Sequence, residues 1–524
     1  MSRSTISSPG AAVAGHPSRP TPGGAAAAAA RSLRMASEFA ASTQGLDGAW
    51  RVFTEPRILE NAVVACSLTG VEGAQAARAR AARWLAGAQV QRHDRFAEAA
   101  DGWLVAVATT GAGAAFVDLD VSDGPRARRA LYLHALACAA GCEGADARRL
   151  LDQVGQALAA EYGQRLKPWQ RTMLLAFQAI ARSVLGLPVP AAGIEALGRA
   201  QGPDGSFYGM PLVTGMLHLA LNRVAPGHRA TLRARENLLA GQHPDGTWRF
   251  MVSETWDTGL MVRALRGHHH FDQAALPDAL AFLAQDQNGD GGWGCAAALD
   301  SDNDTTGNTL LALAGTPWAD QVRAAASGYA RRHQTPEGLW TTWLSHDDTP
   351  APDVVAHMVA GIDFAVLSGI DTAPARRWLA DHGRSGYWPS DWYVPAAYGA
   401  AEISTTAHPH PPHLATVGTL LAQQRPDGGW PRIDGEPYSS PAATGLALTA
   451  LTAHRRYLPE SAPAVDKAVR FLINAQTDDG TWRDRPLMYG PRPFLTATRP
   501  QIHALAARGL RDTLTADQYR GPRP

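Results

Sequence analysis

The sequence predicts an all-helical protein made of two α/α barrels, each of which is a ring of helical hairpins. Three observations predict this fold class. A turn phrase recurs along the chain, apolar runs of helical length lie between its copies, and almost no segment alternates strictly between apolar and polar residues. Self-similarity of this kind is typical of repeat architectures, in which each unit buries its apolar face against its neighbours.

The recurring phrase consists of a Gln, an acidic residue, a Gly, and an aromatic residue that stands six positions after the Gln. Its copies begin at Gln201, Gln242, Gln287, Gln334, Gln424 and Gln476, and a degenerate copy, His382–Trp388, stands in phase within the longest gap. Asp-Gly and Glu-Gly are turn signals because Gly adopts positive φ without steric cost. We therefore interpret these QW-like repeats as staples, in which the Gln amide holds the turn and the aromatic ring covers it.

The segments between the phrases predict the helices. Apolar runs such as Thr258–Leu265, Thr309–Ala314 and Ala443–Ala450 have helical length. The predicted order is therefore turn, helix, turn, helix, repeated along the chain.

Composition narrows the class of protein further. A chain of 524 residues with 45% apolar content exceeds one typical hydrophobic core, which favours two domains. Lys plus Arg equals Asp plus Glu at 48 each, so electrostatics gives no case for nucleic-acid binding. No apolar run reaches the roughly 18 residues of a membrane span. Residues 1–24 lack the apolar stretch of a signal peptide and predict a disordered tail, so we expect a cytoplasmic protein.

A cluster of carboxylates follows the third phrase. Asp300, Asp302 and Asp304 alternate there and are followed by Thr305, Thr306 and an apolar run. Asp304 or Thr305 is expected to cap the helix that follows. A capped helix on a polar loop is one interpretation, and a calcium loop is another, although the Gly and Glu of an EF-hand are absent in register. Acid chemistry is the third.

The cluster has a wider context that favours acid chemistry. Asp302–Thr306 matches the DxDTT form of an acid motif, Glu254–Gly259 contains a WDT segment, and Ser390–Pro395 and Pro486–Gly490 resemble two further motifs of the same proteins, DKWHxSPYY and PLWIGK. With the Gln–Trp repeats, the chain from about residue 200 to its end resembles the bacterial class II terpene cyclases and, more distantly, squalene–hopene cyclase. The Lys and His of DKWH and the Lys of PLWIGK are missing here.

This resemblance implies a domain layout. Residues 25–48 would form the first helix of the β domain, residues 49–251 an inserted γ domain, and residues 252–524 the rest of the β domain, which carries the acid motif. An active site between the two barrels would follow, as ligand sites commonly lie at domain interfaces.

The resemblance also implies how the acid acts. Asp304 would protonate an alkene, and Asp302 would orient and tune it; the alternative register, which begins at Asp300, makes Asp302 the acid. The donor must stay neutral near pH 7, which burial and a neighbouring carboxylate favour and a helix N-terminus opposes. Trp256 and Trp392 would shield the resulting cation with their π faces. As an alternative, these two residues belong only to the core or the staples.

The diphosphate of the substrate requires cations. Lys167, Arg171, Arg492 and Arg499 are the residues we expect to bind it, with a solvated surface role as the alternative. Glu60 resembles an acidic residue of an early family segment and would meet Mg²⁺. The run His346–Asp348 with Asp353 reads as a surface loop and not as an ionisation motif. The histidines at 268–270 and at 408, 410 and 413 read as loop residues, because no fourth ligand stands at a suitable spacing.

The expected function is therefore class II cyclisation of farnesyl or geranylgeranyl diphosphate. The product would be a bicyclic terpenyl diphosphate of the drimane or labdane/halimane type, and a downstream phosphatase or class I synthase would consume it. Two alternatives stay open at this point. One is an enzyme like the β-subunit of protein prenyltransferases, for which Cys295 would have to serve a zinc site. The other is a non-catalytic α/α toroid that acts as a binding module.

Overall fold

The computed structural model describes residues 22–111, 114–116, 124–159, 166–297, 299–342, 349–383, 388–404, 412–455 and 457–518. Within these ranges the regular secondary structure is helical, apart from isolated β-bridges and two short antiparallel pairs, β1 (Trp430–Pro431) with β2 (Ser439–Ser440) and β3 (Met488–Tyr489) with β4 (Leu495–Thr496). The prediction of an all-α protein is thus confirmed. Most of the predicted tail, residues 1–21, lies outside the described residues. No described helix is both long and apolar enough to cross a membrane.

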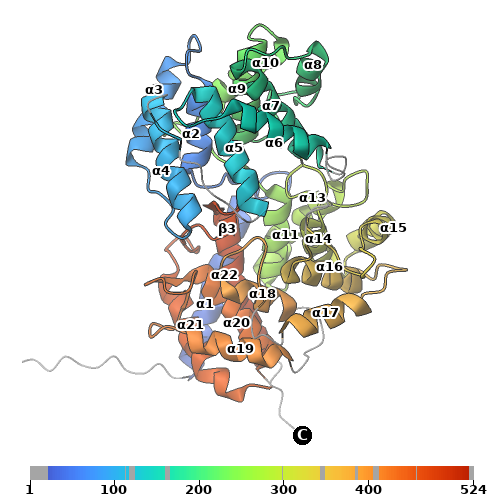
Figure 1. The fold of residues 1–524 in the computed structure, drawn as a ribbon. Helices are drawn as coiled ribbons and strands as arrows, with labels where there is room; N and C mark the ends of the chain where they lie inside the picture. Colours follow the sequence, from blue (N-terminus) through green and yellow to red (C-terminus); the bar gives the residue numbers. More distant parts are fainter. Residues whose placement is uncertain are drawn as a thin grey trace, which may run out of the picture.

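The helices form two lobes (Figure 1). The first lobe contains α2 (Ile58–Ser67), α3 (Gln75–Gly87), α4 (Arg95–Thr110), α5 (Gly124–Ala140), α6 (Ala147–Ala159), α7 (Pro168–Val184), α8 (Ala191–Arg199), α9 (Pro211–Val224) and α10 (Arg229–Ala240). The second lobe contains α1 (Pro22–Thr43), α11 (Glu254–Leu265), α12 (His269–Ala274), α13 (Leu276–Gln285), α14 (Asn303–Leu313), α15 (Pro317–Arg332), α16 (Pro352–Phe364), α17 (Ala373–Gly383), α18 (Ala396–Ser404), α19 (Pro412–Gln423), α20 (Pro441–His454), η3 (Pro459–Ser461), α21 (Ala462–Ala475) and α22 (Arg499–Gln518).

The second lobe is a closed ring of helices. Its inner helices α11, α14, α16, α18, α20 and α22 each pack against the next, and α22 packs against α11 to complete the circle. An outer layer of α1, α13, α15, α17, α19 and α21 packs against them, and α12 packs against α1 and α13. In the first lobe, α2, α4, α5, α7 and α9 form a similar, smaller set of contacts. Both lobes therefore have the predicted α/α architecture.

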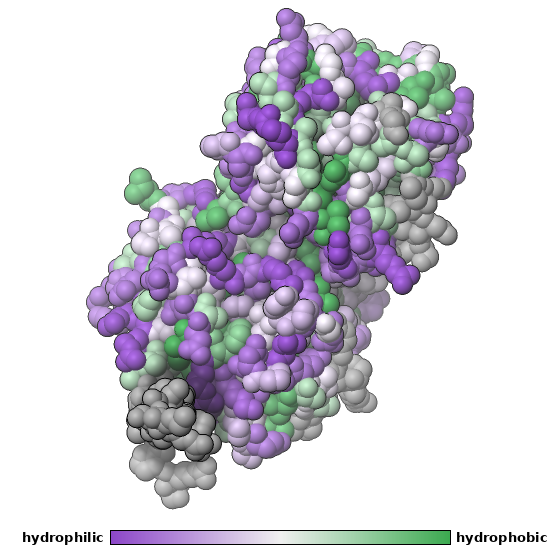
Figure 2. All heavy atoms as spheres, turned by 90° about the vertical axis from the view of Figure 1, so that its left-hand side faces the viewer, coloured by the Kyte–Doolittle hydropathy of each residue, from purple (hydrophilic) through white to green (hydrophobic). Residues whose placement is uncertain are grey.

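Each lobe has its own hydrophobic core. One cluster of buried residues runs from Ile58 to Met251, and the other joins α1 and Trp50 to residues from Trp256 onward. The predicted domain boundaries at residues 48 and 251 stay a prediction. Near both positions, the buried residues change from one hydrophobic cluster to the other. Apolar atoms gather where the lobes meet, on a face that is otherwise largely polar (Figure 2).

The repeated phrases are staples, as predicted, and hydrogen bonds show how they act. In each complete copy, the Gln Nε2 donates both to the Gly carbonyl of its own turn and to a carbonyl in, or just before, a neighbouring helix; these bonds measure 2.8–3.3 Å. The indole N–H at Trp248, Trp293, Trp340, Trp430 and Trp482 donates to the carbonyl ten residues earlier, in the preceding helix. One phrase therefore ties two helices and a turn together.

The sequence contains a further copy that the repeat search missed. Gln44 donates to the carbonyls of Gly48 and Ala275 at 2.8 and 2.9 Å, and the Trp50 indole donates to Ala40 at 3.0 Å. The segment Gln44–Trp50, with the sequence QGLDGAW, carries the full pattern. It was missed because it stands far upstream of the other copies, before the first lobe.

Candidate active site

The two central aspartates of the motif stand at the beginning of α14, one of the inner helices. Asp302 has extended backbone angles and is the N-cap, and its carboxylate accepts from the backbone N–H and the hydroxyl of Thr305 at 2.7 and 2.9 Å. The cap was predicted at Asp304 or Thr305, and that prediction is wrong, because the chain is already helical at Asn303. Asp304 is therefore a buried residue of the first helical turn.

Asp304 is hydrogen-bonded to a histidine that the sequence interpretation did not single out. His357, fully buried on α16, has its Nδ1 2.6 Å from Asp304 Oδ1 and its Nε2 2.9 Å from Oε2 of Glu402 on α18. Burial acts to lower the pKa of His357, but the carboxylates of Asp304 and Glu402 together raise it to about 9. Near neutral pH the ring is therefore an imidazolium that donates to Oδ1 of Asp304 and to Oε2 of Glu402.

Glu402 is fixed by two arginines from other inner helices. Arg263 of α11 and Arg508 of α22 donate to its two carboxylate oxygens, Arg508 at 2.5 Å. Burial acts to raise the pKa of Glu402, yet the two guanidinium groups and His357 hold that pKa well below its usual range. A continuous chain of hydrogen bonds thus runs inside the ring from Asp304 through His357 and Glu402 to the arginines.

Two more buried carboxyl groups adjoin Asp304. Burial raises the pKa of Asp302 to about 7, and Asp304 adds to this, while the bonds from Thr305 and the charge of Lys167 oppose it. Burial likewise raises the pKa of Asp353 to about 7, with Asp304 and Asp391 contributing. Carboxyl groups that crowd together in this way cannot all ionise. The group therefore retains protons near neutral pH.

The structure corrects the interpretation of Asp353 as part of a surface loop. Asp353 lies in the first turn of α16, is 0% exposed, and accepts from the Ser390 hydroxyl at 2.5 Å and from the Asp391 N–H at 3.1 Å. Residues 346–348 of that predicted loop lie outside the described residues. Asp353 and His357 are four residues apart, so on a helix they share one face. This spacing was the signal in the sequence that the two residues are buried together.

Aromatic rings stand beside this group. The ring of Trp256, at the start of α11, lies 5.8 Å from that of His357, and its N–H donates to the Tyr393 hydroxyl at 2.9 Å. Tyr393 stacks on Tyr398 at 4.1 Å. Trp392 is half-buried and packs at the edge of the second core. The substrate-binding roles of Trp256 and Trp392 stay predictions, and the two tyrosines were not foreseen.

Two of the expected diphosphate ligands lie at the acid region. Lys167, from the first lobe, donates its ammonium to the Ser301 carbonyl at 2.8 Å, next to Asp302. Arg492 donates to the carbonyls of Ser390 and Asp391 at 2.9 and 2.6 Å, beside the partners of Asp353. Both side chains therefore approach the carboxyl group from the lobe interface.

The other two cations are placed differently. Arg171 is exposed on α7, one turn beyond Lys167. Arg499 pairs with Asp479 at 2.6 Å and covers the ring of Phe39 on the outer helix α1. These contacts give the predicted role of Arg499 no support, and both roles stay predictions.

The residues around Glu60 do not fit a magnesium site. Glu60 is fully buried, and both its oxygens accept from Arg57, at 2.9 and 2.5 Å. Across the described residues, no group of three or more His, Cys, Asp or Glu side chains is placed to hold a metal ion. The magnesium role of Glu60 stays a prediction without structural support.

Comparison with known proteins finds similarity to terpene cyclases over part of the chain. Residues 212–351 match the family model described as the squalene-hopene cyclase C-terminal domain. A drimenyl diphosphate synthase of Streptomyces showdoensis is 28% identical over 335 residues, 62% of this chain and 55% of the relative. A drimenyl diphosphate synthase of Streptantibioticus cattleyicolor is 29% identical over 318 residues, 53% of this chain and 57% of the relative. The chain thus spans little more than half the length of either relative.

A solved structure supports the fold over nearly the whole chain. The ent-copalyl diphosphate synthase of Streptomyces platensis superimposes with a TM-score of 0.53 at 17% identity, covering 93% of this chain and 99% of that protein. Because identity is low, this likeness concerns the fold. The family model and the two curated relatives support a bacterial class II terpene cyclase.

Proposed function

We propose that the protein is a class II cyclase that protonates a linear isoprenyl diphosphate and closes it to a bicyclic diphosphate. The observation that carries this proposal is the buried Asp304 carboxyl group, bonded to an imidazolium and flanked by two further carboxyl groups. Both curated relatives are named drimenyl diphosphate synthases. Farnesyl diphosphate is accordingly the proposed substrate and a drimane-type diphosphate the proposed product.

Asp304 is the better acid of the pair. Both oxygens of Asp302 accept hydrogen bonds from Thr305, so that carboxyl group is held as an acceptor. At Asp304, His357 donates to Oδ1, which leaves Oδ2 to carry the proton. The imidazolium withdraws electron density from the carboxyl group and stabilises the carboxylate that remains after the proton has left.

The chemical step then balances without a co-reactant. The O–H bond of Asp304 breaks, and the π electrons of the terminal alkene form a new C–H bond. A tertiary cation results, and two internal alkenes attack it in turn to close the rings. Loss of a proton ends the sequence, so the diphosphate stays on the product. The π faces of Trp256, Tyr393 and Tyr398 stand beside the acid, where they stabilise positive charge without acting as strong nucleophiles.

The diphosphate is proposed to bind at Lys167 and Arg492. These two cations approach the acid region from both sides of the lobe interface. A bound diphosphate would replace the backbone carbonyls that they now contact, and it would hold the apolar tail toward Asp304.

The test is product analysis after incubation with C10, C15, C20 and C30 substrates. We expect the C15 diphosphate to give a bicyclic alcohol by mass spectrometry, and only after phosphatase treatment. Release of inorganic diphosphate in step with substrate loss would overturn the proposal. Conversion of the C20 substrate alone would reassign the substrate and leave the acid mechanism intact.

A further inference from the structure

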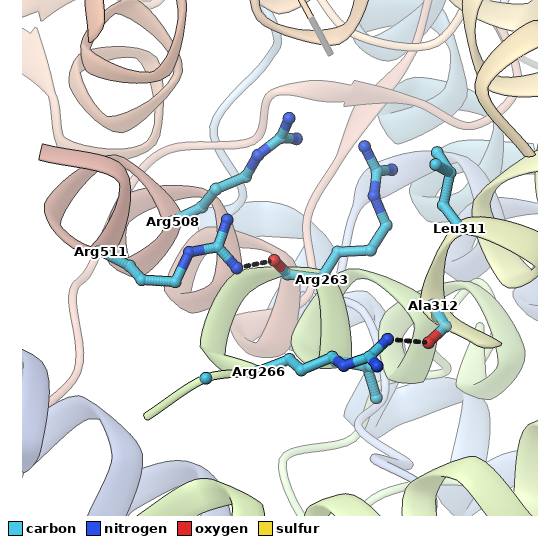
Figure 3. Close-up of a pocket in the computed structure, with 8 residues that line it drawn as sticks. Arg263, Arg266, Leu311, Ala312, Arg508 and Arg511 are labelled. Carbon is cyan, nitrogen blue, oxygen red and sulfur yellow. Dashed lines mark hydrogen bonds between the residues drawn. The ribbon is translucent and has the colours of Figure 1, made fainter. Parts of the chain in front are cut away.

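A hollow of about 430 Å³ lies at the end of the second lobe away from the acid. Its lining comes from the end of α11, the end of α14 and the middle of α22: Val262, Arg263, Arg266, Gly267, Leu311, Ala312, Arg508 and Arg511 (Figure 3). Asp304 and Trp256 stand at the opposite ends of α14 and α11. Along α14, Asp304 and Leu311 are about 10 Å apart. The hollow is therefore separate from the site described above.

The hollow is rich in positive charge. Four arginines line it, and two carboxylates pair with them: Glu402 with Arg263 and Arg508, and Asp512 with Arg508 and Arg511. Arg266 donates to the carbonyls of Ala312 and Ala314, and no described carboxylate pairs with it. The two helix C-termini each contribute only about half a negative charge. A net positive charge remains.

The hollow is also connected to the acid. Arg263 and Arg508, which line it, are the same groups that hold Glu402. Glu402 accepts from His357, and His357 contacts Asp304. Any ligand that draws these guanidinium groups toward the hollow therefore weakens their hold on Glu402, two hydrogen bonds away from the proton donor.

We propose that this arginine-lined hollow binds a phosphate-type oxyanion and thereby slows the acid step. Guanidinium groups match phosphate oxygens by bidentate hydrogen bonds, and the volume suits one or two phosphate groups. When the anion engages Arg263 and Arg508, Glu402 loses positive partners and attracts the His357 proton more strongly. As the Nε2 proton shifts toward Glu402, the ring loses positive charge, and its Nδ1–H becomes a weaker donor to Asp304. The Asp304 carboxylate is then less stabilised, which makes Asp304 a weaker acid.

Binding is tested first, with inorganic diphosphate as the probe in isothermal titration calorimetry. Inorganic diphosphate also fits the proposed substrate site, so two classes of site are expected in the wild-type protein. The double variant Arg266→Gln/Arg511→Gln should lose one class and keep the other. Arg376→Gln, which removes a surface partner of Asp363, is the matched control and should keep both. Unchanged binding by the double variant would overturn the proposal.

Two single variants guard against misfolding. Arg511→Gln alone should weaken the same class of site, and Arg266→Lys, which keeps the charge, should retain most of the binding. Circular dichroism confirms that each variant is folded. Equal weakening by Arg266→Lys and the double variant would count against recognition by charge.

The effect on turnover rests on the proposed function, whereas the calorimetry does not. With saturating substrate, added diphosphate should slow the wild-type enzyme at least about fivefold, the lower range of measured coupling between sites. The ratio of rates with and without the anion should return toward one in the double variant. If high substrate concentrations abolish the inhibition in every variant, the anion acts only by competing with substrate in the active site. That result would overturn the proposed coupling between the hollow and Asp304. Inorganic phosphate as a second probe distinguishes a single phosphate from a diphosphate.

Discussion

At the scale of single residues, Asp302, Asp304 and Asp300 have distinct surroundings. Asp304 contacts an imidazolium, Asp302 caps α14, and Asp300 is exposed. The three substitutions to Ala should therefore differ in severity. Asp304→Ala should abolish cyclisation, at or beyond the upper end of the roughly 10²–10⁴-fold contribution of general-acid catalysis. Asp302→Ala should cost less activity, and Asp300→Ala least.

The measurement is the initial rate of all three variants side by side, with circular dichroism as the folding control. A larger loss for Asp302→Ala than for Asp304→Ala would assign the acid to Asp302. Near-normal turnover in all three would remove the proposed mechanism altogether.

His357 makes stability depend on pH. Its pKa is raised from 6.5 to about 9 in the folded protein. The stabilisation from its charge is therefore fully present below pH 6.5 and is lost as the pH rises through about 9. Asp302 and Asp353, whose pKa values are raised to about 7, also bind protons more tightly when folded, so they lower stability as the pH rises from about 4 to 7.

The melting temperature of the wild-type protein should accordingly fall between pH 6.5 and 9. In His357→Asn, which keeps a hydrogen-bond donor but cannot titrate there, the fall should be shallower. Differential scanning calorimetry at several pH values measures both slopes. Equal slopes would show that His357 does not carry the predicted charge.

At the scale of the elements, the staples determine how neighbouring hairpins meet. The turn at Gly480 shows why the phrase requires Gly: its φ is +86°, and a Cβ there would lie 2.4 Å from the Met35 carbonyl oxygen. Gln476 makes three side-chain hydrogen bonds at the same contact. Its Nε2 donates to the Gly480 carbonyl within the turn and to the Ser32 carbonyl on α1, and its Oε1 accepts from the Ser32 hydroxyl at 2.7 Å. The side-chain amide thus joins the last phrase to the first helix.

Gln476→Ala should destabilise the protein by about 3 kcal/mol, because its three side-chain hydrogen bonds, of about 1 kcal/mol each, are lost. Gln423→Ala is the matched control, since Gln423 bonds only to the surface residue Asp434 at 3.3 Å. Urea unfolding of both variants gives the two free energies of unfolding. A cost for Gln476→Ala no greater than that of the control would mean that the amide has no stapling role.

The sequence predicted these elements well because their information is local. Turn residues stand within seven positions of one another, and apolar runs reveal helices directly. The relay beyond the acid could not be predicted in the same way, since His357, Glu402, Arg263 and Arg508 come from four helices far apart in the chain. Arg499 was expected to bind the diphosphate, but the direction of its side chain, toward Asp479 and Phe39, depends on packing against α1, which is far away in the chain.

At the scale of the whole molecule, the second lobe is assembled from both ends of the chain. Helix α1 packs against α21, α22 and α12, so it fills one position of the outer layer (Figure 1). The first lobe is inserted between α1 and α11. A chain that lacks residues 1–43 would therefore expose apolar surface on α22 that Leu33, Ala36 and Ala40 now help to cover.

Deletion of residues 1–43 should thus abolish cooperative unfolding of the second lobe. Deletion of residues 1–21, the greater part of the predicted tail, should leave it unchanged. Thermal unfolding followed by circular dichroism compares the two truncated chains. A cooperative transition of wild-type amplitude in the longer deletion would show that α1 is dispensable.

The contact between Ser32 and Gln476, which are 444 positions apart, also bears on synthesis in the cell. Helix α1 is synthesised before its partners α21 and α22, so it packs against them only late in synthesis. At about 5–20 residues per second, α1 waits roughly 20–90 s before α21 and α22 emerge. The intervening lobe, contiguous in sequence, can fold during that time. An apolar helix that stays unpaired for so long while its neighbour folds is a natural client for a chaperone.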